Sequence, residues 1–275
     1  MVEIWRHRGL LRELVRRDLR TRYKVSVLGF FWSLLRPLLS VAIISVVFTY
    51  VVPLEHRSFS HVSYFAFLLC GYLPWAFLTG ALAEGTQALL TNAHLIKKVA
   101  CPRLIFPLAV VLAHLVNTVL AFSVLLPLTY LFLGMRPPFS CFWLIPLLVG
   151  EGLLVVGLAW GLSALNVLYR DVTQILEFIT LAWFYATPII YSIDLPLDFL
   201  SRVGMPNALY FLNPMSTLVY ASRRACLGIP TDAEWVMPSS PLAFGIVVFV
   251  AMSIAAPLAG QALFRRLETR AVDTL

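Results

Sequence analysis

An arginine inside a long apolar run is the residue of this sequence that is most clearly suited to a chemical role. Arg36 lies in the run that begins near residue 27, about two to three helical turns from its start. Placing an arginine at mid-membrane costs roughly 2.5–3.5 kcal/mol on insertion scales, and less where the side chain reaches the interface. Two roles are therefore open for Arg36: a snorkelling cation, or a cation that meets a phosphate group at the inner leaflet.

Glu151 is an acidic residue in another such run, with glycines at positions 150, 152, 157 and 161. A carboxyl group inside a membrane is a functional candidate by default. A protonated carboxyl, or one bonded within a helix bundle, fits equally well, since small residues at these intervals allow close helix packing. His114 and Asn117 form one turn of polar face in a third run. That pattern more often bridges helices than binds a ligand.

The common catalytic motifs are absent from the sequence. None of the 14 glycines is followed by lysine, which excludes a Gly-x-x-x-x-Gly-Lys phosphate loop. Neither a His-Glu-x-x-His zinc motif nor a Gly-x-Ser-x-Gly nucleophile motif occurs. No catalytic residue and no metal site is therefore predicted. If the chain takes part in active transport, ATP has to be hydrolysed by another chain.

The elements that must position these residues are membrane-spanning helices. Hydrophobic residues make up 60% of the 275-residue chain, charged residues 13%, and the mean hydropathy is +0.85. A soluble domain is about 45–50% apolar and about 25% charged, so this composition argues against a water-soluble fold. The apolar runs are continuous and do not alternate with polar residues, which argues against a β-barrel.

Crossing the hydrocarbon core of a bilayer takes about 20 apolar residues. The sequence predicts an all-α integral membrane protein, with a segment 1–24 followed by one transmembrane domain over residues 25–275. Six transmembrane helices are predicted, at about 27–52, 62–84, 104–134, 142–168, 172–192 and 241–264.

The distribution of the net charge of +7 sets the orientation. In the six-span arrangement, 15 of the 21 Lys and Arg residues lie on one side, eight of them before the first span. The positive-inside rule then places both termini in the cytoplasm. Because this distribution is explained by membrane topology, nucleic acid is not a predicted partner.

The four cysteines show neither metal nor redox spacing. Only Cys141 and Cys226 fall on the outer side, where a disulfide persists. A disulfide between these two and four ordinary buried thiols are the alternatives.

The first 24 residues predict a basic amphipathic helix that lies on the membrane. Arginines fill the positions between apolar residues that recur at helical spacing, namely Leu11, Leu14, Val15 and Leu19. The apolar side of this helix is expected in the headgroup boundary. A topology anchor without a further role is the alternative.

Segments 91–101 and 205–227 are also predicted to form short helices. The first places the apolar pair Leu95–Ile96 beside Lys97–Lys98, which indicates an amphipathic contact surface and not a plain loop. The second is too short for two crossings and too apolar for water. It is therefore expected to re-enter the outer leaflet as short helices before the last span.

Several segments, taken in order, resemble the permeases of polysaccharide-exporting ABC transporters. These are the ABC-2-type proteins that export O-antigen, capsular polysaccharide or teichoic acid. The segments are residues 22–37, 92–103, 166–172, 187–191, 212–214, 264–268 and 271–273. Arg36 departs from the resemblance, because relatives commonly carry Asn or another neutral residue before the proline. Binding of a lipid pyrophosphate by Arg36 is thus a hypothesis specific to this sequence.

The resemblance implies a homodimer in a bacterial cytoplasmic (inner) membrane, bound to two copies of a separate cytoplasmic ABC ATPase. That ATPase would hold ATP and Mg, so no cofactor is expected on this chain. The implied substrate is a glycan on a polyprenyl pyrophosphate, in contact with membrane lipid and moved out of the cytoplasm. A permease for a small lipid, haem or drug is one alternative function. A membrane-bound glycosyl- or lipid-modifying enzyme is another.

The same resemblance suggests roles for three groups of residues. Those expected to couple to the ATPase are Arg16, Arg17, Asn92, His94, Leu95, Ile96, Lys97 and Lys98. Those expected at the outer gate are Tyr210, Asn213 and Pro214. Sugars stack on aromatic rings, and the rings expected to line the pore are Phe31, Trp32, Trp75, Trp183 and Tyr185. Aromatic belts at the membrane interfaces are the alternative explanation for most rings.

Overall fold

A computed structural model of the chain describes residues 5–24, 29–51, 64–98, 101–134, 136–228 and 239–274. Within these ranges every regular element is a helix, which confirms the all-α membrane fold class. The α-helices are α2 Arg8–Lys24, α3 Gly29–Val46, α4 Tyr64–Thr91, α5 Ala93–Lys98, α6 Ile105–Leu133, α7 Leu144–Leu168, α8 Val172–Ala186, α9 Asp194–Arg202, α10 Pro214–Leu227 and α11 Ser239–Thr274. Three shorter elements are the π-helix η1 Val47–Val51 and the 3-10 helices η3 Phe139–Trp143 and η4 Asn207–Leu212.

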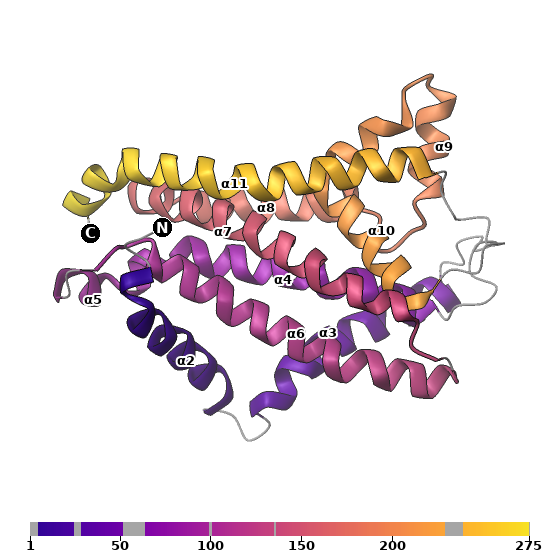
Figure 1. The fold of residues 1–275 in the computed structure, drawn as a ribbon, viewed down its shortest axis with the longest axis horizontal. Coiled ribbons are helices and arrows are strands. Elements are labelled where there is room, and N and C mark those ends of the chain that lie inside the picture. The colour runs from indigo at the N-terminus through magenta and orange to yellow at the C-terminus, as the bar shows by residue number, and fades with distance from the viewer. Residues whose placement is uncertain are drawn as a thin grey trace.

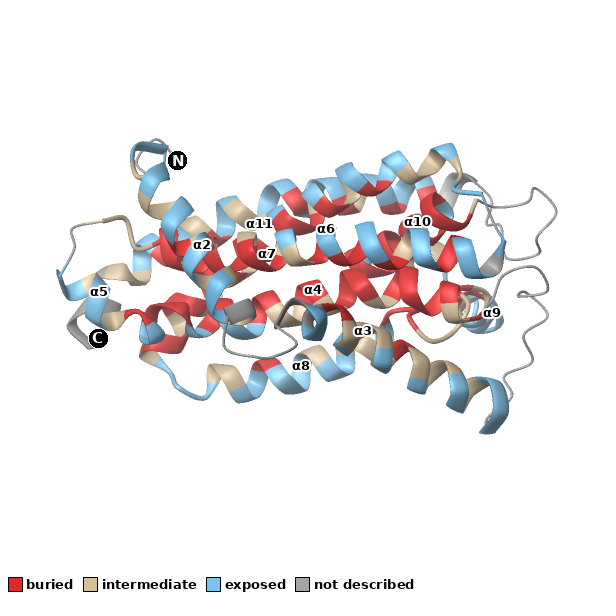
Figure 2. Cartoon of the chain, turned by 90° about the horizontal axis from the view of Figure 1, so that it is seen from below, coloured by how far each residue is buried: buried red, intermediate tan, exposed pale blue. Residues whose placement is uncertain are grey.

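The long helices run side by side along the molecule, with α4 packed between α6 and α7 and with α11 lying along α7 (Figure 1). Most residues of α4 are buried, whereas α3 and α8 expose much of their surface (Figure 2). The two marked chain ends and α5 lie at one end of the bundle, and α9 lies at the other (Figure 1).

Five helices in the described ranges are long and apolar enough to cross a membrane. These candidate spans are Leu34–Val51, Tyr64–Thr91, Ile105–Phe132, Phe139–Leu168 and Leu242–Glu268. The chain is thus a multi-pass membrane protein. The five helices overlap five of the six predicted spans; the first residues of the predicted spans 27–52 and 62–84 lie outside the described residues.

The predicted span 172–192 is the one whose helix is too short to be a candidate membrane span. Its helix, α8, has 15 residues and ends at Ala186, so it is about 22 Å long, shorter than the roughly 30 Å hydrocarbon core. The cause is Pro188, which lacks an N–H and disfavours helical geometry in the residue before it. Thr187 accordingly adopts an extended conformation. A further helix, α9, follows where the sequence predicted only the end of a span.

Two other helices run further than their apolar sequence. α4 continues to Thr91 and α11 to Thr274, beyond the predicted ends at residues 84 and 264. Hydropathy detects only the part of a helix that lies in lipid, and helix formation itself continues until the backbone is interrupted.

The amphipathic helix α2 packs against α6 of the bundle. Leu14 is only 5% exposed and belongs to the main core, and Leu10, Leu11 and Val15 pack against that core. The sequence placed this apolar side in the headgroup boundary. In the structure this apolar side faces the protein, because α6 presents an apolar surface beside α2.

The contact between α7 and α11 depends on two glycines. A Cβ atom at Gly157 would overlap the backbone of Ala256 and Pro257, and one at Gly260 would overlap the carbonyl of Gly157. The two helices therefore approach to backbone contact, as the glycine spacing in the sequence indicated.

Gly157→Ala is expected to lower the Tm of the detergent-solubilised chain by roughly 3–10 °C, because overpacking costs about 1–3 kcal/mol. Gly152→Ala on the same helix is the matched control, since its Cβ would lie 3.5 Å from Leu115, an ordinary contact. The control should keep or raise the Tm, as alanine is favoured over glycine in helices by about 1 kcal/mol. Equal Tm values for the two variants would contradict the close helix packing.

Candidate functional site

A polar cavity of about 420 Å³ lies between α2, α3, α4 and α6. Four helices from separate parts of the sequence contribute its walls, three of them candidate membrane spans. Its polar lining residues are Arg22, Arg36, Ser40, Tyr72, Glu84, His114 and Asn117. Two arginines face one carboxylate, so the cavity carries a net positive charge and suits an anion.

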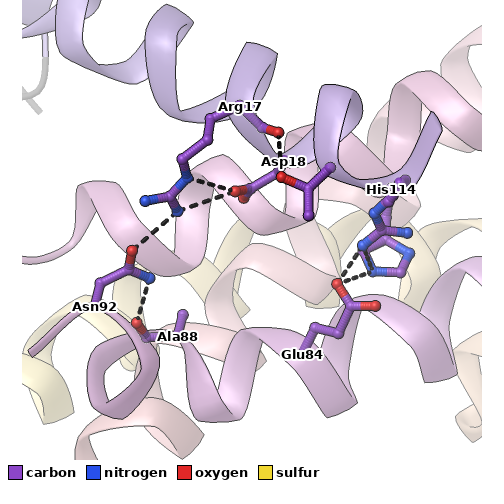
Figure 3. A network of polar contacts seen from close by, with 8 residues as sticks. Arg17, Asp18, Glu84, Ala88, Asn92 and His114 are labelled. Carbon is purple, nitrogen blue, oxygen red and sulfur yellow. Dashed lines mark hydrogen bonds and ion pairs between the residues drawn. The ribbon is translucent and has the colours of Figure 1, made fainter. Parts of the chain in front are cut away.

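The Glu84 carboxylate lies at the centre of a polar network in this cavity. Arg22 of α2 forms an ion pair with Glu84 of α4. Nε2 of His114 on α6 lies 3.1 Å from Oε2 of the same carboxylate (Figure 3). The Arg22 guanidinium also lies 2.6 Å from Nε2 of His114. Gly80, one turn before Glu84, leaves room for the imidazole, because a Cβ there would lie 2.8 Å from the ring.

Arg36 lies on α3 with an exposed side chain that lines the cavity. In the described part of the chain no carboxylate pairs with it. Arg22, by contrast, is already engaged by Glu84. Of the two cavity arginines, Arg36 therefore has its guanidinium donors available for a bound anion.

A second link ties α2 to the α4–α5 turn. The Arg17 guanidinium donates to Oδ1 of Asn92 at 2.9 Å and pairs with Asp18 at 3.0 Å. Nδ2 of Asn92 in turn donates to the carbonyl of Ala88 at 2.8 Å (Figure 3). Two of the residues predicted to couple to an ATPase, far apart in sequence, are thus brought into contact.

The remaining residues of that predicted group lie on the surface at the same end. Arg16 is exposed and pairs with Glu13 at 3.4 Å. In α5, Ile96 packs against the core, and the outward-facing side chains are His94, Leu95, Lys97 and Lys98. The segment 91–101 therefore contains a short helix with one side held to the bundle and one basic side exposed.

The aromatic residues predicted to line a pore fall into two groups. Phe31, Trp32 and Tyr185 are 67%, 45% and 60% exposed on α3 and α8, and Trp32 also lines the polar cavity. Trp75 is buried, with its ring edge-on to that of Trp183 at a centroid distance of 6.1 Å. Trp75 packs inside the helix bundle, whereas the first group faces outward.

The residues predicted at an outer gate surround the start of α10. Asn213 caps this helix, because its Oδ1 accepts from the N–H of Met215 at 3.0 Å. The same oxygen accepts from the Trp183 indole at 2.8 Å, which joins α10 to the end of α8. Pro214 occupies the first helical position, where its missing N–H costs no hydrogen bond.

Tyr210 lies beside Tyr191, with 3.3 Å between the two hydroxyl oxygens. Burial raises the pKa of both phenols, so these hydroxyls stay protonated. The pair belongs to the same region as Asn213, between α8 and α10. The outer-gate residues are thus brought together, and they lie on elements other than those that line the polar cavity.

Arg223 on α10 is a residue that the sequence analysis did not single out. It is 2% exposed, and its guanidinium donates to the carbonyls of Phe67 at 3.2 Å, Pro188 at 2.6 Å and Ile189 at 2.6 Å. It also stacks on the Phe67 ring at 3.4 Å. The arginine therefore holds α10 against α4 and against the break after α8.

Sequence reasoning missed Arg22, Glu84 and Tyr72 as members of the site. Glu84 was the available signal, because it is an acidic residue at the end of an apolar run and so needs a cation nearby. Glu151, which the sequence did single out, lies elsewhere: it is fully buried and does not line the cavity. Neither of its carboxyl oxygens has a hydrogen-bond partner in the described part of the chain.

Comparison with known proteins supports a transport role. Residues 9–227 match the ABC-2 type transporter family. An O-antigen export system permease protein RfbA from Myxococcus xanthus is 30% identical over 217 residues, covering 79% of this chain and 80% of the relative. Two proteins of the same name from Klebsiella pneumoniae are 26% and 27% identical over 97% of this chain and 95% of each relative.

These relatives are named as permeases, so the chain is a transport component and not an enzyme. The match extends from α2 through α10 and includes every element that builds the polar cavity. The resemblance seen in the sequence is confirmed at the level of the family. The chain belongs to the ABC-2 type transporter family.

Proposed function

We propose that this chain is the membrane-spanning permease of an ATP-driven exporter that moves a lipid-linked, O-antigen-like polysaccharide out of the cytoplasm. The observation that carries the proposal is the double attachment of α2. Arg17 joins this helix to Asn92 at the α4–α5 turn, and about one and a half turns later Arg22 joins it to the cavity wall. One helix therefore contacts both the surface proposed for an ATPase and the cavity proposed for the substrate.

The working assembly in this proposal is two copies of the chain with two copies of a separate ATPase, which holds ATP and Mg. Both marked chain ends and α5 lie at one end of the bundle (Figure 1). Exposed basic residues on α5 and near the end of α11 favour the cytoplasm for this end. The membrane is then the bacterial inner membrane, with the α9 end facing outward.

The coupling path starts at α5, which presents Lys97 and Lys98 to the ATPase. Movement of α5 displaces Asn92 and, through its hydrogen bond, Arg17. Because α2 is a continuous 17-residue helix, the end that carries Arg22 moves together with Arg17. Arg22 then shifts relative to Glu84, and the positive charge that the cavity offers to a substrate changes.

The lipid pyrophosphate is proposed to bind at Arg36. An arginine presents paired N–H donors that match phosphate oxygens, and the hydrogen bonds are strengthened by the charge. Glu84 would repel such an anion if it stood alone, but its pairing with Arg22 cancels that charge. The cavity of about 420 Å³ suits a headgroup and not a polymer, so the glycan has to extend outside it.

The glycan is proposed to follow the exposed rings of Phe31, Trp32 and Tyr185 on α3 and α8. Both helices expose one side along much of their length (Figure 2). A second copy of the chain facing these helices would enclose a passage lined by aromatic rings, which stack on sugars. Asn213 and Tyr210, at the far end of α8, are proposed as parts of its outer gate.

A permease for a small lipid is the second candidate, and one observation favours it. An apolar cavity of about 860 Å³ lies between α6 and α7, with Phe122 and Leu148 in its walls. A cavity of this size and polarity suits an acyl chain. The two functions differ in the molecule that is transported, so deletion of the gene distinguishes them.

Deletion of the gene is expected to trap lipid-linked glycan inside the cell and to remove the glycan from the surface. Surface staining and extraction of lipid-linked glycan measure the two pools. Normal surface glycan after deletion would contradict the proposal. Loss of a small lipid from the outer leaflet, with glycan unchanged, would favour the second candidate.

Charge reversal by Lys97→Glu with Lys98→Glu is expected to reduce export by about tenfold or more, while the partner ATPase still hydrolyses ATP. Loss of complementary charge at a contact costs on the order of 1–3 kcal/mol of coupling. ATP hydrolysis and surface glycan are measured on the same cells or vesicles. Arg265→Glu with Arg266→Glu, an exposed basic pair of α11, is the matched control. Unchanged export in the α5 variant would show that α5 does not couple the chain to an ATPase.

Arg36→Ala is expected to weaken binding of a polyprenyl pyrophosphate by about tenfold to a hundredfold, because a hydrogen bond to a charged group contributes about 1.5–3 kcal/mol. Binding is measured on the purified chain, with the matching polyprenol, which lacks phosphate, as the control ligand. Ser40→Ala, one turn further along the same cavity wall, should have a smaller effect. A variant that fails to insert or dimerise would assign Arg36 a structural role instead.

A further inference from the structure

Three of the four cysteines meet between the outer parts of α4, η3 and α10. They are Cys70 on α4, Cys141 on η3 and Cys226 on α10, and they come from distant parts of the sequence. Cys141 and Cys226 both contact the Tyr130 hydroxyl, and Cys70 and Cys226 belong to the same buried core cluster. The two residues that the sequence placed on the outer side are therefore neighbours in space.

Side-chain hydrogen bonds hold η3 against the last turn of α10. The Tyr130 hydroxyl of α6 lies 3.0 Å from Sγ of Cys141 and donates to the carbonyl of Cys226 at 2.5 Å. Ser140 donates to the carbonyl of Ala225 at 2.9 Å. Sγ of Cys141 also lies 3.9 Å from the carbonyl of Cys226. These contacts fix Cys141 beside Cys226 from both sides.

The two thiols differ in accessibility. Cys226 is fully buried, whereas Cys141 is partly exposed and lines the apolar cavity between α6 and α7. An oxidant can therefore reach Cys141 but not Cys226 directly. Cys70 is as buried as Cys226, so a bond between these two has no accessible sulfur from which to start.

We propose that Cys141 and Cys226 form a reversible disulfide that fastens the last turn of α10 to η3. This inference rests on the orientation given with the proposed function, which places the pair outside the cytoplasm, where disulfides persist. The first turn of α10 is already held at Asn213 by the Trp183 indole. The disulfide would hold the other end of this helix and so restrict its movement.

The chemistry is thiol–disulfide exchange with an external oxidant that carries a disulfide. The thiolate of Cys141 attacks one sulfur of the oxidant and breaks its S–S bond, which releases the other sulfur as a thiol. The thiolate of Cys226 then attacks the Cys141 sulfur in this mixed disulfide and releases the oxidant's second thiol. The two cysteines lose two electrons and two protons, and the oxidant's disulfide gains both.

Thiol counting in membranes tests the pairing. Membranes that contain the full chain are treated with diamide or with dithiothreitol, denatured, and labelled with a polyethylene glycol maleimide that adds a mass step for each free thiol. The chain has four cysteines, so we expect four additions after reduction and two after oxidation. Cys141→Ser and Cys226→Ser should each show three additions under both conditions.

Cys101→Ser and Cys70→Ser are the matched controls, because each should still lose two additions on oxidation. Four additions in the oxidised chain would overturn the proposal. Three additions in oxidised Cys70→Ser would also overturn the proposal, because Cys70 would then belong to the bonded pair. The assay needs neither ATP nor glycan, so its failure leaves the export function standing. Normal surface glycan after gene deletion would likewise leave the thiol count unchanged.

Discussion

A carboxylate near the membrane needs a cation, and this requirement organises the end of the bundle where α2 lies. Glu84 projects from α4 at the end of an apolar run, with 56% of its side chain exposed, so its ion pair contributes up to about 1 kcal/mol. Arg22 of α2 and His114 of α6 supply its partners. Together with the apolar packing of Leu14 in the main core, this ion pair holds α2 against the bundle. The paired residues Arg22 and Glu84 also form part of the wall of the polar cavity.

The position of α2 in turn connects two regions of the molecule, the α4–α5 turn and the polar cavity. Arg17 reaches the α4–α5 turn, and Arg22 forms part of the cavity wall. In the proposed mechanism, a push at α5 moves α2 along its axis and thereby changes the charge beside Arg36. At the other end, Arg223 and Asn213 hold α10 to the break after α8. The molecule thus has one polar junction at each end, joined by packed helices, of which α7 and α11 approach to backbone contact at Gly157.

The sequence predicted the parts of this structure that a bilayer dictates. Long apolar runs have to be helices there, and the bounds of α6 and α7 agree with the predicted spans 104–134 and 142–168 within two residues. The span 172–192 was wrong in length because Pro188 interrupts it, a local effect that hydropathy does not register. The network of Arg22, Glu84 and His114 was not predictable, because it joins residues 62 and 92 positions apart. Of the residues proposed for the site, the sequence singled out Arg36 as a snorkelling cation or a phosphate ligand, but not the charges that surround it.

Exchange of the two charges between α2 and α4 tests the central claim most directly. Arg22→Glu and Glu84→Arg are compared, singly and together, for surface glycan and for ATP hydrolysis in cells with equal amounts of chain in the membrane. Each single variant is expected to lose most export, because each places two like charges together. The double variant, which restores the ion pair in reverse, is expected to recover a large part of it. Full export in the single variants, or no recovery in the double variant, would contradict a role of the Arg22–Glu84 ion pair in export.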